Sequence, residues 1–172
     1  MTDAPPLNPE ERRLVRMILA RKGQPDFIIA DATSQQQQAL LSATDNLFEK
    51  NGITPAYIDL SRGEGVGAVM KQLAEYAAAG VDVVHLTGGG DWLRGREPFN
   101  DGTAARADIL NIQRENLFRI PVKTILWLAP DDIATLASTA PDLWAWRAGI
   151  YDLSAPAAAP VQKMPAAPAG PK

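Results

Sequence analysis

The sequence predicts an α/β fold, namely a three-layer sandwich in which helices cover both faces of a mostly parallel sheet of four to five strands, plus an N-terminal helix. Three observations predict it. Short apolar runs alternate with longer segments of helical periodicity, which is the pattern of βαβ units. The runs are apolar throughout, as expected of strands that are buried on both faces. The length of 172 residues suits one domain of this kind.

The elements are expected in the following order. The first helix begins at Asn8, an N-cap residue followed by Pro9 and two acids, and it ends at Gly23. Apolar periodicity predicts further helices at 35–50, 67–79 and 103–119, and from Pro130 and Pro141 onward. Strands are expected at 27–30, 56–60, 81–86 and 122–128, with an edge strand at 150–153. The Gly-rich segment 87–102 is expected to be a loop.

Composition divides the chain into three parts. Residues 1–24 form a tail and the N-terminal helix, and residues 25–154 form the α/β domain. Residues 155–172 are rich in Ala and Pro, so we expect a disordered tail there.

Composition also excludes several classes of function. The absence of cysteine excludes disulfides, a thiolate nucleophile and a Cys-based zinc site, and the single histidine excludes a His-rich metal site. A net charge of −3 argues against nucleic acid as a partner. No apolar run approaches the roughly 18 residues of a membrane span, and the N-terminus does not resemble a signal peptide. We therefore expect a cytoplasmic protein without a membrane or nucleic-acid partner.

The segment from Asp31 to Gln38 follows the first strand and occupies the place of a phosphate-binding loop. In an ungapped comparison with G-x-x-x-x-G-K-[ST], Asp31 and Gln36 replace the glycines. Gln37 replaces the lysine, and Gln38 replaces the hydroxyl residue. The spacing is kept while the chemistry is lost. We expect Asp31 or Ser34 to cap the following helix, although a helix N-terminus still attracts anions.

Two other loops contain glycines at the ends of predicted strands. Gly63, Gly65 and Gly67 do not match the dinucleotide-binding fingerprint, and we expect them to serve loop flexibility and helix entry. The third strand ends in Thr87, where active P-loop ATPases carry an acid, and Asp91 follows four residues later. Asp91 alone is a weak cation ligand. The three intervening glycines are expected to permit close approach of another chain or segment.

Candidate contacts with a ligand or partner are a small set of charged and aromatic residues: Asp91, Arg114, Trp144, Trp146 and Arg147. Arg114 is expected to share a helix face with Asn111, one turn earlier. Because Trp144 and Trp146 are two residues apart, we expect one to be buried and the other to be exposed or at an interface. His85 is expected to be a hydrogen-bonded core residue with no acidic partner beside it in the sequence, and Trp127 a core residue.

Several segments resemble bacterial STAND-like NTPase domains, and more closely their degenerate, inactive versions in conflict and defence proteins. These segments are Asn111-x-x-Arg114, Thr124-Ile-Leu-Trp-Leu-Ala-Pro130, Ala140-Pro-Asp-Leu-Trp-Ala-Trp-Arg147 and Tyr151-Asp152. The resemblance spans residues 25–153 and implies a P-loop-NTPase-like topology. Active members bind ATP through a Walker A lysine and a Walker B acid, but this chain has Gln37 and Thr87 at those places. ATP hydrolysis is therefore not carried over.

The resemblance implies a non-catalytic regulatory or scaffolding module, or adaptor, in bacterial immunity or signalling. Such a module would recognise a protein partner or self-associate, and it would need no cofactor. Two alternatives remain open. One is a nucleotide-binding switch that holds ATP or another nucleotide without hydrolysis, with Arg114 on the phosphate. The other is an α/β hydrolase that uses Asp31, Asp91 or His85.

Overall fold

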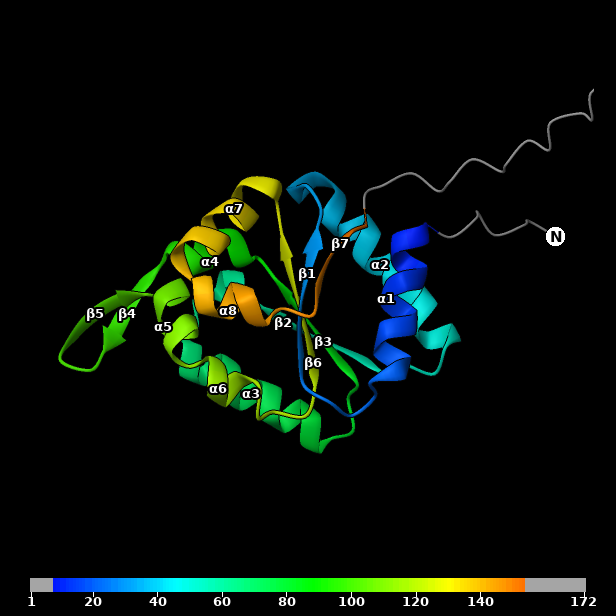
Figure 1. Ribbon diagram of the computed structural model, residues 1–172, viewed down its shortest axis with the longest axis horizontal. Helices are drawn as coiled ribbons and strands as arrows, with labels where there is room; N and C mark the ends of the chain where they lie inside the picture. The colour runs from blue at the N-terminus through cyan, green and yellow to red at the C-terminus, as the bar shows by residue number, and fades with distance from the viewer. Residues whose placement is uncertain (1–7, 154–172) are drawn as a thin grey trace, which may run out of the picture.

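The computed structural model describes residues 8–153, so the tails predicted at the two ends lie outside the described residues. Five parallel strands form one sheet in the order β2-β3-β6-β1-β7 (Figure 1). The strands are β1 (Asp26–Asp31), β2 (Pro55–Asp59), β3 (Val83–Thr87), β6 (Lys123–Leu128) and β7 (Gly149–Asp152). The predicted parallel sheet is confirmed, as is the position of the last strand at its edge.

Helices cover both faces of this sheet, which confirms the three-layer sandwich (Figure 1). One face carries α1 (Pro9–Ala20) and α2 (Ser34–Lys50). The other face carries α3 (Val66–Ala78), α4 (Gly89–Arg94), α5 (Arg106–Ile112), α6 (Arg114–Leu117), α7 (Pro130–Thr139) and α8 (Pro141–Trp146). A short 3₁₀ helix, η1 (Leu60–Arg62), follows β2.

The central strands are apolar throughout because both of their faces are covered. In β1, Phe27 and Ile29 belong to the core beneath the α3–α8 layer, whereas Ile28 and Ala30 belong to the core beneath α1 and α2. All four side chains are at most 2% exposed. Burying such a side chain stabilises the fold by roughly 1.5–3 kcal/mol, so two separate cores hold the sheet in place.

The strand order gives the sheet its topology. Counted within the sheet alone, the order is 2-3-4-1-5, with β6 inserted between β1 and β3. Together with the strand–helix alternation, this arrangement is P-loop-NTPase-like, as predicted. The carboxyl ends of β1, β2, β3 and β6 meet at one edge, where ligands bind in open parallel sheets.

The first helix begins as the sequence predicts. The Asn8 side chain accepts a hydrogen bond from the Glu10 backbone N–H at 2.8 Å, and the Glu11 carboxylate accepts one from the Asn8 N–H at 3.3 Å. This reciprocal pair is a capping box, with Pro9 at the first helical position.

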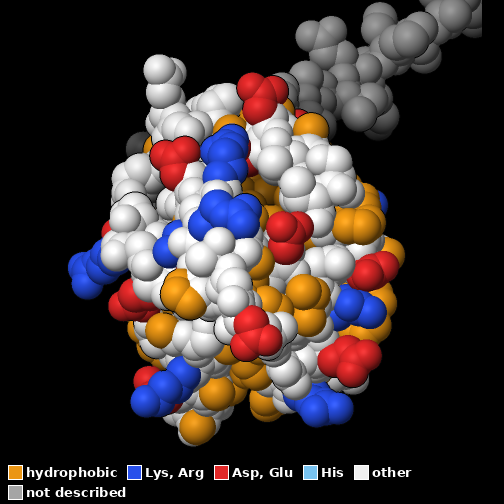
Figure 2. Space-filling model, turned by 90° about the vertical axis from the view of Figure 1, so that its left-hand side faces the viewer, with side chains coloured by type: hydrophobic (Ala, Val, Ile, Leu, Met, Phe, Trp, Pro, Cys, Tyr) orange, Lys and Arg blue, Asp and Glu red, His pale blue; other side chains and the backbone are white. Residues whose placement is uncertain are grey.

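The segment 87–102 is not the loop that we expected. It contains α4 and an antiparallel hairpin of β4 (Arg96–Phe99) and β5 (Gly102–Ala105), which projects from the body (Figure 1). Pro98 lies in β4 and has no N–H to offer a further strand. The guanidinium of Arg96 donates to the Thr103 carbonyl at 3.0 Å. Basic and acidic side chains are interspersed on the face that carries the hairpin (Figure 2).

The single helix predicted at 103–119 is also wrong. Its first residues pair with β4 as strand β5, and the helical part is divided at Gln113 into α5 and α6. The Arg114 guanidinium donates to the carbonyl of Asn111 at 2.7 Å. A side chain that captures a backbone carbonyl in this way interrupts the i→i+4 ladder of a helix.

Candidate functional site

The connection between β1 and α2 is too short to form a phosphate-binding loop. Only Ala32 and Thr33 separate the two elements. The Ala32 N–H donates to the Leu128 carbonyl at 3.1 Å, and the N–H groups of Gln36 and Gln37 donate to the Thr33 carbonyl at 2.9 and 3.1 Å. Three backbone donors of this segment, those of Ala32, Gln36 and Gln37, are therefore already engaged within the protein.

Helix α2 also begins differently from our expectation. Its N-cap is Thr33, and no side chain makes a cap hydrogen bond. The prediction that Asp31 or Ser34 caps the helix is therefore wrong. The Thr33 hydroxyl instead donates to Gln36 Oε1 at 3.0 Å. Helical geometry begins at Ser34 and leaves Asp31 in the strand.

A cavity of about 400 Å³ lies at the carboxyl edge of the sheet. It is lined by residues from α2, η1, α4, α5 and α7, together with the ends of β3 and β6: Ser34, Gln37, Leu60, Ser61, Gly63, Gly88, Gly89, Gly90, Asp91, Trp92, Arg106, Trp127, Ala129 and Asp132. Of the predicted phosphate-loop residues, Ser34 and Gln37 reach this cavity. Its size is typical of a small-molecule pocket.

The glycine triplet on one wall allows three segments to approach closely, as predicted. Gly88 adopts a φ of +72°, and a Cβ there would lie 2.9 Å from the Ser61 nitrogen. A Cβ on Gly89 would lie 2.8 Å from the side chain of Leu126, and one on Gly90 would collide with Asp132. These glycines therefore bring η1, β6 and α7 against the start of α4.

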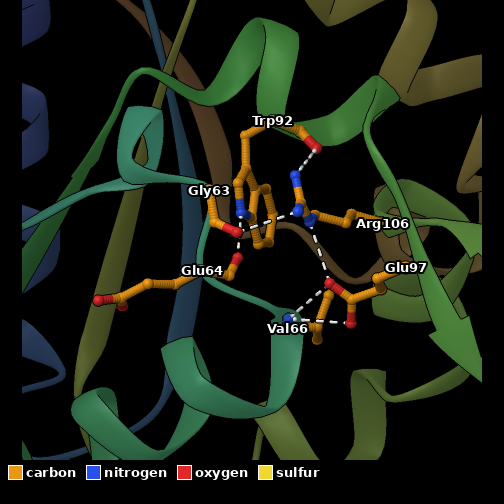
Figure 3. Close-up of polar contacts among 6 residues, drawn as sticks. All are labelled: Gly63, Glu64, Val66, Trp92, Glu97 and Arg106. Atoms are coloured by element: carbon orange, nitrogen blue, oxygen red, sulfur yellow. Dashed lines mark hydrogen bonds and ion pairs between the residues drawn. The ribbon is translucent and has the colours of Figure 1, made fainter.

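Arg106 also lines the cavity, and its polar contacts are shown in Figure 3. Its Nε donates to Glu97 Oε2 at 3.0 Å, and its two terminal nitrogens donate to the carbonyls of Trp92 and Gly63. Glu97 in turn accepts from the Val66 N–H at 3.2 Å, at the first residue of α3. The hairpin thereby caps α3, since a carboxylate at a helix N-terminus satisfies a free donor.

The charged side chains of the cavity lining, Asp91, Arg106 and Asp132, each have an oppositely charged partner outside it. Arg106 pairs with Glu97, and Arg94 pairs with Asp132. Asp91 is fully exposed, with Arg94 at 3.3 Å. A phosphate in this cavity would meet the carboxylates of Asp91 and Asp132, and the lining cation Arg106 is already paired with Glu97, which disfavours anion binding.

Asp31 lies at this edge but outside the cavity, beside a second carboxylate. It occupies the same register as Asp152 on the adjacent strand β7. Burial raises the pKa of Asp31 above its ordinary value of 3.8, and the charge of Asp152 adds to the shift. In contrast, hydrogen bonds from Ser61 lower the pKa of Asp59, at the end of β2.

Replacing Asp31 by asparagine is expected to raise stability at neutral pH. A carboxyl group whose pKa is raised by folding stabilises the protein at low pH, and this stability is lost as pH rises through the folded pKa. The advantage of Asp31→Asn should therefore appear above about pH 3.8 and grow up to the raised pKa. Urea unfolding at several pH values measures it. Asp59→Asn is the matched control, and it should lower stability at neutral pH, because folding lowers the pKa of Asp59. The same pH dependence of stability in both variants would contradict these opposite pKa directions.

His85 does have an acidic partner, which the sequence did not reveal. The imidazole is fully buried, with Nε2 2.9 Å from Asp45 Oδ1 and Nδ1 accepting from Trp127 Nε1 at 2.9 Å. Because the indole N–H can only donate, Nε2 carries the proton and donates to Asp45. Phe48 and Tyr57 stack on the ring. The prediction of a hydrogen-bonded core histidine is confirmed, and both ring nitrogens are committed.

The three residues of the hydrolase alternative do not converge. His85 is level with Ile28 across the intervening strand β6, two strand spacings away, or about 10 Å. Asp31 lies a further three residues along β1, again about 10 Å. Asp91 is fully exposed on α4. His85 and Asp31 are therefore too far apart to act on the same atom of one bound substrate.

The motif Asn111-x-x-Arg114 joins α5 to α8 within the protein. Asn111 Oδ1 accepts from the backbone N–H groups of Asp142 and Leu143, both at 2.9 Å, and thus caps α8. Its Nδ2 donates to Asp142 Oδ2 at 3.2 Å. Arg114 lies 3.7 Å from the Asp142 carboxylate and stacks on Trp146. Asn111 and Arg114, which carry part of the resemblance, therefore bind α8 within the protein.

Both late tryptophans lie under arginines. The Arg147 guanidinium is 4.1 Å from the Trp144 ring, and Arg114 is 5.2 Å from the ring of Trp146, which also contacts Phe118 edge-on. Trp144 is half-buried and Trp146 is 43% exposed. Trp146 is thus exposed as expected, whereas Trp144 is less buried than expected, and Trp127 is buried as predicted. Of the predicted contact residues, Asp91 alone lines the carboxyl-edge cavity.

Replacing Asn111 by alanine is expected to destabilise the protein by about 1–2 kcal/mol, since a lost helix cap costs that much. The variant removes the acceptor for two N–H groups of α8. Asn116→Ala, an exposed site one helix further on, is the control and should change little. Guanidinium unfolding checks both variants. If Asn111→Ala matched the control, the capping role would be refuted.

Sequence reasoning missed Trp92, Glu97, Asp132 and Asp45. Asp132 had a visible signal, because it follows Pro130 directly beyond a predicted strand, at the edge where ligands bind. Glu97 and Asp45 had none, since their partners lie 31 and 40 residues away in the sequence.

In residues 8–153, no group of three or more His, Asp or Glu side chains is placed to hold a metal ion. No helix in the same range is long and apolar enough to cross a membrane.

The fold and the carboxyl-edge cavity together define a class: an α/β domain of P-loop-NTPase-like topology in which two residues join β1 to α2. Among solved structures, the chain is similar to the DnaC helicase loader, with 15% sequence identity, a TM-score of 0.41, and coverage of 87% of this chain and 94% of that one. No family model matches the sequence. No curated protein matches it either.

Proposed function

We propose that the chain is a non-catalytic module that acts by protein–protein contact, as a regulator or scaffold in a bacterial defence or signalling system. One observation carries this proposal. The β1–α2 connection has two residues, and the N–H groups of Ala32, Gln36 and Gln37 are bonded within the protein. The part of the fold that would bind a nucleoside phosphate therefore has a different structure.

The side chains around that edge support the same proposal. Gln37 stands at the lysine position, and its side-chain Nε2 donates to the Ala32 carbonyl at 3.1 Å, within the same β1–α2 segment. Thr87 ends β3 where a catalytic acid would stand. The Mg²⁺ chemistry of phosphoryl transfer needs both a hydroxyl ligand and an acid, and Gln38 supplies no hydroxyl.

The test is thermal unfolding with ATP, ADP, GTP and cyclic nucleotides, each with and without Mg²⁺. A ligand that binds the folded state at 100 times its Kd stabilises by about 2.7 kcal/mol, which gives an easily measured rise in Tm. We expect no saturable rise with any of them. Gln37→Lys should not gain Mg²⁺-dependent ATPase activity, because Gln38 and Thr87 are unchanged. Saturable stabilisation or turnover would contradict the proposal.

A second candidate is a nucleotide-binding switch without hydrolysis, and the cavity of about 400 Å³ is the observation that favours it. The cation that lines the cavity is Arg106. Arg114, which the sequence suggested, instead lies beside the Asp142 carboxylate of α8. Arg106 would first have to leave Glu97. The same thermal measurement decides between the two candidates, and a nucleotide-induced rise in Tm selects the switch.

A further inference from the structure

A second cavity, of about 320 Å³, lies between α1 and α2, on the face of the sheet away from α3–α8. It is lined by residues of these two helices and the α2 C-cap: Arg12, Val15, Arg16, Leu47 and Asn51. The two helices contact each other and run side by side (Figure 1). We call this feature the α1–α2 groove.

The α1–α2 groove has an apolar floor and a cationic rim. Val15 and Leu47 are 7% and 9% exposed, so their surfaces close the bottom. Arg16 is exposed, and within residues 8–153 it makes one hydrogen bond, from Nε to the Arg12 carbonyl at 3.4 Å, and no ion pair. The exposed Arg16 guanidinium therefore remains able to pair with a carboxylate of a partner.

The rim continues along both helices with the same chemistry. Leu19 lies one turn beyond Arg16, and therefore on the same helical face, and it is 42% exposed. Lys50 is exposed one turn beyond Leu47 on α2. The lining contains no acid, although the whole chain has a net charge of −3. The groove is thus locally cationic with apolar positions at helical spacing.

We propose that the α1–α2 groove docks an acidic amphipathic helix of a protein partner. Apolar side chains of that helix would rest on Val15, Leu47 and Leu19, and its carboxylates would pair with Arg16. Guanidinium groups bind carboxylates in bidentate geometry, and a helix laid in a groove presents apolar anchors at i, i+3, i+4 and i+7. This inference rests on the proposed function by protein contact, and it names the surface and the chemistry of the partner.

The test uses two labelled helical peptides in fluorescence anisotropy with the full chain. One is built from Glu, Leu and Ala, with Leu at i, i+3, i+4 and i+7, and the other has Lys in place of every Glu. The acidic peptide should bind, and the lysine peptide should bind at least about tenfold more weakly. Arg16→Glu should weaken the acidic complex by about tenfold or more. Lys71→Glu, on α3 and with the same charge change, should leave it unchanged.

Leu19→Ala keeps the charge and should also weaken the acidic complex, which tests the apolar contact separately. Both groove variants alter exposed side chains, and circular dichroism verifies that they fold. Equal affinity for the two peptides, no binding of either, or equal effects of Arg16→Glu and Lys71→Glu would overturn the inference. These outcomes differ from a nucleotide-induced rise in Tm, which would instead overturn the proposed function.

Discussion

Replacing Lys123 by alanine is expected to lower the free energy of unfolding by about 3–5 kcal/mol, the usual cost of removing one partner from a buried ion pair. Lys123 begins β6, and its side chain is 1% exposed. Its Nζ donates to the carbonyls of Arg21 and Gln24 at 2.5 and 2.9 Å, and to the Asp26 carboxylate at 3.1 Å. The truncation leaves Asp26 buried and the two carbonyls without this donor.

The measurement is urea unfolding followed by circular dichroism. Lys71→Ala, on the exposed surface of α3, is the control and should stay within about 0.5 kcal/mol of the parent. The double variant Asp26→Leu, Lys123→Met should lose less stability than Lys123→Ala, because it removes both charges together. A loss below about 1 kcal/mol for Lys123→Ala would show that the pair does not hold α1 and its following turn to the sheet.

Replacing Trp127 by alanine is expected to cost about 3–5 kcal/mol, as large-to-small changes of core aromatics do. The side chain is 1% exposed and packs beneath α1 and α2. Trp127→Phe keeps an aromatic ring in the core but removes the indole N–H that donates to His85 Nδ1. That variant should cost about 1–3 kcal/mol, the penalty for a buried acceptor without a partner.

The two variants also test the tautomer of His85. In the parent protein, ¹⁵N NMR should show the proton on Nε2, since Nδ1 accepts from the indole at 2.9 Å. In Trp127→Phe that constraint is removed, and the Nδ1 resonance should move. An Nδ1-protonated imidazole in the parent would contradict the hydrogen-bond direction assigned here.

The sheet could be predicted from the sequence because its strands carry their signal locally. Runs such as Phe27–Ala30 are apolar over four consecutive residues, and tertiary burial on both faces imposes that pattern. The capping box at Asn8 was equally visible, since all of its members lie within four residues.

The segment between β3 and β6 could not be predicted in this way. Gly88 and its two neighbours indicated a loop, yet α4 starts there because η1, β6 and α7 pack where side chains would otherwise stand. Thr103–Ala105 has helical composition but pairs with β4. In both cases long-range packing overrides local propensity.

The carboxyl-edge cavity and the predicted phosphate-loop residues overlap only in Ser34 and Gln37. The other walls of the cavity include Arg106, Trp92 and Asp132, which the sequence places far from that segment. Conversely, Arg114 looked available for a ligand and is engaged with Asp142 and Trp146. The spacing of Asn111 and Arg114 indicated that they share a face, but it could not show that this face contacts α8.

The β4–β5 hairpin has a consequence for the behaviour of the protein at high concentration. An exposed two-stranded ribbon is a template on which further strands can add without limit, and such addition leads to aggregates. Pro98 removes a donor from one strand, and Arg96 occupies the Thr103 carbonyl on the other. These two residues therefore protect the exposed edges of the hairpin from open-ended strand addition.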